Sequence, residues 1–234
     1  MKINKSSLFL TAMLGMFSLA PLQADTLNLY LKVDGGALNQ VATSSTGVIN
    51  YSNTSTPNYS SISINASGTP ALAEPGLDLN SLDVTTSNAF TGSSLVIQLT
   101  EQGLSTLTSP LPVMEAFATI LRSQNTSAAE SISFQNYVDS TNSAEASGCG
   151  GSCSLIGSYS TSAQGSTAMN MTGTETFTSP FSETEVITIN FSASSQSAFG
   201  DDNISSAPEP MSMGLLGGGL ALLGVARLRR SKKA

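Results

Sequence analysis

The chain has 234 residues, with nine basic and sixteen acidic residues, a formal net charge of −7, and neither histidine nor tryptophan. The absence of histidine excludes Ser-His-Asp and Cys-His catalysis. The acidic balance excludes nucleic-acid binding, which needs clustered Lys and Arg.

The first residues have the layout of a secretory signal peptide. Lys2 and Lys5 precede the apolar run 8–19, and Pro21 and the small residue Ala24 follow it. The run is shorter than the roughly 20 residues of a membrane-spanning helix, which disfavours a retained anchor. We expect Sec-dependent export and removal of residues 1–24 by signal peptidase.

The segment between the two ends is far more acidic than the whole chain. Between residues 25 and 210, only Lys32 and Arg122 oppose all sixteen acidic residues, so this segment has a formal net charge of −14. Such a segment is repelled by anionic membrane surfaces and stays soluble at neutral pH.

Apolar residues that alternate with polar ones predict many short strands and no intervening helices. These runs contain Leu27, Leu29, Leu31 and Val33; Ile62, Ile64 and Ala66; Leu95, Ile97 and Leu99; Ile132, Phe134 and Val138; Met169, Met171 and Phe177; Ile187, Ile189 and Phe191. Turn-forming residues follow at 34–36, 90–92 and 147–151. We therefore predict an all-β, antiparallel β-sandwich over residues 25–193.

Three segments are harder to assign. Residues 42–68 are rich in Ser, Thr and Asn, and we expect long loops there around one or two strands. Residues 113–121 have apolar residues at helical spacing, but their strand-like neighbours favour a strand. The polar residues 194–206 are predicted to be a flexible linker.

The only cysteines, Cys149 and Cys153, flank two glycines and a serine. In an oxidising compartment they are expected to form a structural disulfide. The spacing differs from the Cys-x-x-Cys of redox proteins, and two thiolates without histidine do not complete a zinc site.

Other candidate site residues are carboxylates and tyrosines. Glu183 and Glu185 point the same way along a strand, but a solvated face is the favoured interpretation. Asp201-Asp202-Asn203 offers oxygen ligands for calcium, although a solvated loop is favoured. Five tyrosines are candidate sugar-binding platforms, of which Tyr30 is expected to be exposed: Tyr30, Tyr51, Tyr59, Tyr137 and Tyr159. We predict no catalytic residues, metal site or cofactor.

The last residues combine three features in order. Pro208-Glu209-Pro210 favours an extended backbone, and the uncharged residues 211–226 form a short candidate transmembrane helix. A basic tail follows, which is expected to stay on the cytoplasmic side: Arg227, Arg229, Arg230, Lys232 and Lys233.

In this order, at the end of a chain with a signal peptide, residues 207–234 resemble the PEP-CTERM sorting signal of exported proteins from Gram-negative bacteria. The resemblance implies cleavage near the motif by exosortase. It also implies transient anchoring in the inner membrane and delivery to the cell surface or extracellular matrix, where exopolysaccharide is a candidate partner.

These observations favour a non-enzymatic exported matrix protein. Two alternatives stay open: a carbohydrate- or calcium-binding module for the cell's own polysaccharide, and, less favoured, a glycan hydrolase that uses two carboxylates.

Overall fold

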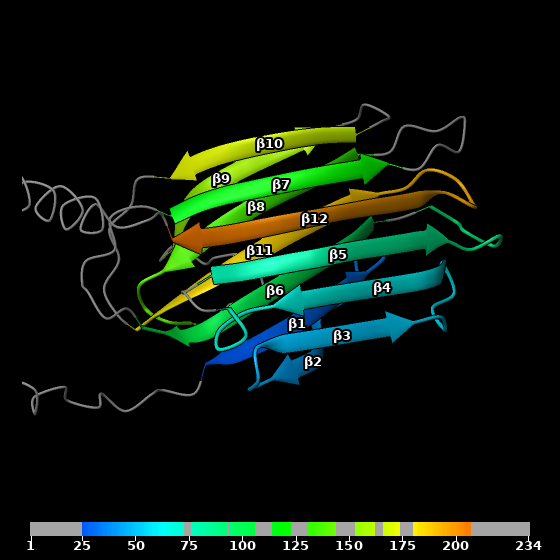
Figure 1. Ribbon diagram of the computed structural model, residues 1–234. Helices are drawn as coiled ribbons and strands as arrows, with labels where there is room; N and C mark the ends of the chain where they lie inside the picture. The colour runs from blue at the N-terminus through cyan, green and yellow to red at the C-terminus, as the bar shows by residue number, and fades with distance from the viewer. Residues whose placement is uncertain are drawn as a thin grey trace, which may run out of the picture.

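The computed structural model describes residues 25–72, 76–92, 94–105, 114–122, 131–143, 153–161, 166–173 and 180–206. All regular elements in these ranges are strands, in two six-stranded antiparallel sheets that lie face to face (Figure 1). The predicted β-sandwich is therefore confirmed. The described ranges contain no helix able to cross a membrane, and the predicted transmembrane helix 211–226 lies outside them.

The first sheet has the order β2-β1-β6-β11-β8-β9 and the second β10-β7-β12-β5-β4-β3. The strands of the first sheet are β1 (Thr26–Val33), β2 (Asn39–Ser44), β6 (Ser94–Leu104), β8 (Ser131–Asp139), β9 (Ser154–Thr161) and β11 (Phe181–Asn190). Those of the second are β3 (Val48–Asn53), β4 (Tyr59–Ser67), β5 (Gly76–Thr86), β7 (Met114–Arg122), β10 (Ser166–Gly173) and β12 (Ser197–Ser206).

Strand alternation directs one set of side chains from each sheet into a shared apolar core. Leu29 of β1, Ile97 of β6 and Ile187 of β11 are fully buried there, as are Ile64 of β4 and Leu79 of β5 from the opposite sheet. At Asp34 and Gly35 the chain turns from β1 with φ of 55° and 72°, a left-handed conformation that these two residue types tolerate well.

Two expectations about segments are corrected and one is confirmed. Residues 42–68 contain two strands as expected, but these are β3 and β4 of a hairpin with short connections and not strands set among long loops. Residues 194–206 are not a flexible linker: β12 pairs with both β5 and β7, so the sandwich ends at Ser206 rather than at residue 193. Residues 114–122 form β7, which confirms the strand assignment.

The sandwich begins and finishes at one end. β1 and β11 are both antiparallel to β6 and therefore run in the same direction. Residues 191–196 join β11 to β12, which runs back. The start of β1 at Thr26 and the end of β12 at Ser206 consequently lie at the same end of the sandwich (Figure 1). We call this the terminal end.

Candidate functional site: a buried carboxyl cluster

Four carboxylic side chains lie between the two sheets toward the terminal end. We call them the carboxyl cluster: Glu101 of β6, Glu183 and Glu185 of β11, and Asp202 of β12. Their side chains are 0–1% exposed. Glu183 and Glu185 were expected on a solvated face, and that expectation is wrong.

The inward direction of these side chains follows from strand alternation. Glu101 shares a face of β6 with the core residues Leu99 and Ile97, and Glu185 shares a face of β11 with Ile187. Within the first sheet, Glu183 is the register partner of Glu101. Glu185 is likewise opposite Asn136 of β8.

The second sheet adds Asp202 from its central strand. Asp202 lies in register with Leu79 of β5 and with Ala118 of β7. Its Oδ1 accepts a hydrogen bond from Asn136 Nδ2 at 3.1 Å, so this polar contact crosses from one sheet to the other.

Burial dominates the electrostatics of the cluster. It raises the pKa of Glu101 to about 8, an effect that the nearby backbone amide and hydroxyl of Thr69 reduce only in part. Neither carboxylate oxygen of Glu101 has a hydrogen bond of good geometry. Burial, with the adjacent Glu101 carboxyl, raises the pKa of Glu183 well above its usual range.

The other two carboxyl groups behave in the same way. Burial, followed by the charge of Asp202, raises the pKa of Glu185 well above its usual range. Burial raises the pKa of Asp202 to about 7, against the opposing effect of the hydrogen bond from Asn136. Because desolvation disfavours the charged form of each group, the cluster as a whole retains protons at neutral pH.

The predicted oxygen triplet at 201–203 does not form a single site. It lies in β12 rather than in a solvated loop, and alternation places Asp202 inside while Asp201 and Asn203 belong to the opposite face. Among the described residues, no group of three or more acidic, histidine or cysteine side chains has an arrangement that could hold a metal ion.

The tyrosines do not form an open platform. Tyr30, expected to be exposed, is only 9% exposed, and Tyr59 is fully buried. Tyr59 packs edge-on against Phe90 and Phe191, with ring centroids 6.0 and 5.9 Å apart. The other three tyrosines are half-buried.

The remaining predicted site residues lie largely outside the described ranges. The motif Pro208-Glu209-Pro210, the basic tail 227–233 and Cys149 all fall there. Cys153 is half-buried just before β9 and is not a free cysteine. Because Cys149 is not described, its disulfide with Cys153 stays a prediction.

Comparison with models of known protein families and with curated proteins found no match to this chain.

Proposed function

We propose that this chain is an exported, non-enzymatic protein of the cell surface or extracellular matrix that an exosortase processes at Pro208-Glu209-Pro210. Signal peptidase removes residues 1–24, and residues 211–226 hold the chain in the inner membrane until processing. The sandwich then associates with exopolysaccharide.

The observation that carries this proposal is that the predicted signal peptide and the sorting motif lie immediately next to the two ends of the folded domain. Asp25 alone separates the predicted signal peptide from β1, and Ala207 alone separates β12 from the motif. Removal of the signal peptide and of the sorting signal would leave the sandwich and almost nothing else.

The carboxyl cluster supports a non-enzymatic role. A glycan hydrolase of the usual kind places two carboxyl groups across a cleft that admits the sugar. Here Glu183 and Glu185 are neighbours on one strand and are fully buried, so a polysaccharide has no access to them in this conformation.

Intact mass spectrometry of the protein from medium and membrane fractions tests the proposal. We expect a released species that starts at Asp25 and ends near Pro208. Glu209→Gln, or glutamine in place of the five basic tail residues, should retain the unprocessed chain in the membrane. Asp83→Asn, which removes one negative charge on β5, should be processed normally. A membrane species that still ends at Ala234 as the sole product contradicts the proposal.

A further inference from the structure

The carboxyl cluster contains hydrogen-bond acceptors that lack donors. Seven of its eight carboxyl oxygens have no hydrogen bond of good geometry, although the amide and hydroxyl of Thr69 lie near Glu101: both oxygens of Glu101, Glu183 and Glu185, and Oδ2 of Asp202. Asn136 is 3% exposed and its Oδ1 also has no partner, although its Nδ2 is bonded to Asp202. Ionised carboxylates buried without partners are very costly, so the folded state must neutralise some of them.

No described side chain supplies the opposite charge. Lys32 and Arg122 are the only basic residues between 25 and 210, and they lie in register with Val96 and Ala198, toward the far ends of their strands. The described residues also offer no metal-holding arrangement.

Among the residues that the structure describes, the other charged groups around the cluster are all acidic. Asp25 precedes β1, Asp78 lies on the outward face of β5, and Asp201 lies on the outward face of β12. Glu115 of β7 is in register with Ser205. The inward neighbours are apolar: β1 places Leu27 opposite Glu101, and β4 and β5 contribute Ile64, Ala66 and Leu79 to the same core.

Register identifies where protons would satisfy the unpaired acceptors. Glu183 is directly opposite Glu101, so one proton between them would make one carboxyl a donor to the other. Glu185 is directly opposite Asn136, whose Oδ1 is the unpaired amide acceptor. A protonated carboxyl supplies the O–H donor that each pair lacks.

We propose that the carboxyl cluster is a proton-binding site that closes the terminal end of the sandwich. Glu183 and Glu101 share one proton, and Glu185 holds a second that it donates to Asn136. Folding therefore takes up two protons at neutral pH, and loss of these protons weakens the contact between the sheets. This proposal is independent of export and processing.

The expected pH dependence has a definite sign. The folded pKa values lie above the ordinary carboxyl values, so the stabilisation is complete below the unfolded pKa, 4.5 for glutamate. It is lost as the pH rises through the folded pKa of about 8 for Glu101 and through those of Glu183 and Glu185, which burial raises well above their usual range. Each proton that only the folded state holds changes the unfolding equilibrium constant about tenfold per pH unit. Two protons give a change of about a hundredfold.

The test measures denaturant unfolding of the full chain in mild detergent from pH 5 to 9. We expect the unfolding equilibrium constant to rise about a hundredfold per pH unit between pH 5 and 7. Glu183→Gln and Glu185→Gln each supply an amide N–H donor that does not titrate. Each variant should therefore reduce the slope by about tenfold per pH unit. Asp34→Asn, at the exposed turn after β1, is the matched control and should leave the slope unchanged.

Infrared spectroscopy provides a measurement that does not depend on the variants. The wild-type chain at neutral pH should show the carbonyl band of a protonated carboxylic acid. Absence of this band together with a flat stability profile would overturn the proposal. Strong stabilisation by calcium chloride that is reversed by a chelator, again without the acid band, would also overturn it and assign neutralisation to a cation.

Discussion

Gly68 packs so closely against the carboxyl cluster that its backbone leaves no room for a side chain. An added Cβ at this position would lie 2.7 Å from Cδ and 2.9 Å from Oε1 of Glu101. Ordinary contacts at a Cβ are 3.4–4 Å; because Glu101 is fully buried between the sheets, its carboxyl group can move aside only by displacing other core atoms. Overpacking of this kind typically costs about 1–3 kcal/mol.

We therefore predict that Gly68→Ala lowers the free energy of unfolding by about 2 kcal/mol. The φ of Gly68 lies outside the left-handed region, so the backbone itself accepts alanine. The smaller entropy of the unfolded chain offsets the loss by at most about 1 kcal/mol. Denaturant midpoints at constant m value measure the change.

A double-mutant cycle identifies the cause of this loss. In a Glu101→Ala background the carboxyl group that Cβ would strike is gone, so the same Gly68→Ala change should be nearly neutral. The coupling energy is expected to be about 1–2 kcal/mol. If Gly68→Ala costs the same with and without the Glu101 carboxyl, the steric reasoning is wrong.

Three further changes test other parts of the sandwich. Gly47→Ala should cost more than about 2 kcal/mol in denaturant unfolding, because φ is +71° and its Cβ would lie 2.5 and 2.8 Å from backbone carbonyl oxygens that cannot give way; a loss below 0.5 kcal/mol refutes this. For Asp139, burial alone would raise the pKa, but hydrogen bonds from Ser143 and Thr141 outweigh it and hold the pKa below its usual value. Its stabilisation is therefore present above the unfolded pKa and lost as the pH falls through the folded pKa, so Asp139→Asn should cost about 1–2 kcal/mol at pH 7 and less at pH 3; an equal cost at both values contradicts this. A chain without β12 should lose its cooperative thermal transition while one that ends at Ser206 keeps it, and equal transitions would show that β12 is dispensable.

Strand alternation was sufficient to predict the architecture. Runs such as Leu27–Leu29–Leu31 have the period of a strand with one buried face, and the structure places them in the core. The segment 113–121 was ambiguous because its apolar residues also fit a helix. Its strand-like surroundings were the better guide, since β7 must pair with β12 and β10.

The β12 strand was missed because the polar composition of residues 194–206 indicated a linker. Its inward positions are Ala198, Gly200, Asp202 and Ile204, and only one of these is a large apolar residue. A strand that pairs on both sides obtains much of its order from backbone hydrogen bonds, which leave no trace in composition. The sequence signal for this strand was that small and apolar residues recur at every second position.

The buried glutamates were missed although the alternation pattern was present. Glu183 and Glu185 have the same parity as Phe181, Ile187 and Ile189, all fully buried. This parity already indicated the inward face. The general rule that glutamate is almost never fully buried without a partner outweighed it. The disagreement between alternation and that rule was itself the signal of an unusual site.

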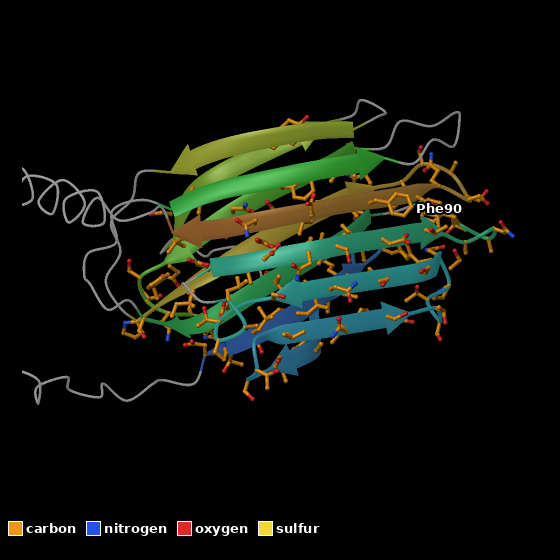
Figure 2. All side chains as sticks on the ribbon, in the orientation of Figure 1. Phe90 is labelled. Carbon is orange, nitrogen blue, oxygen red and sulfur yellow. The ribbon has the colours of Figure 1, made fainter. Side chains whose placement is uncertain are left out.

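The position of the cluster determines where loss of protons should act. Three of its four carboxyl groups come from β11 and β12, which are central strands of opposite sheets, so repulsion between ionised groups separates the sheets at the terminal end. At the other end, where Figure 2 labels Phe90, the rings of Tyr59, Phe90 and Phe191 pack edge-on against one another and link the two sheets. We therefore predict that hydrogen-exchange protection falls first in the last residues of β12 as the pH rises from 6 to 9, whereas the first residues of β12 keep theirs. Protection factors corrected for intrinsic exchange rates measure this gradient. A uniform loss along β12 would mean that ionisation acts on the whole fold and not on the contact that the carboxyl cluster makes between the sheets.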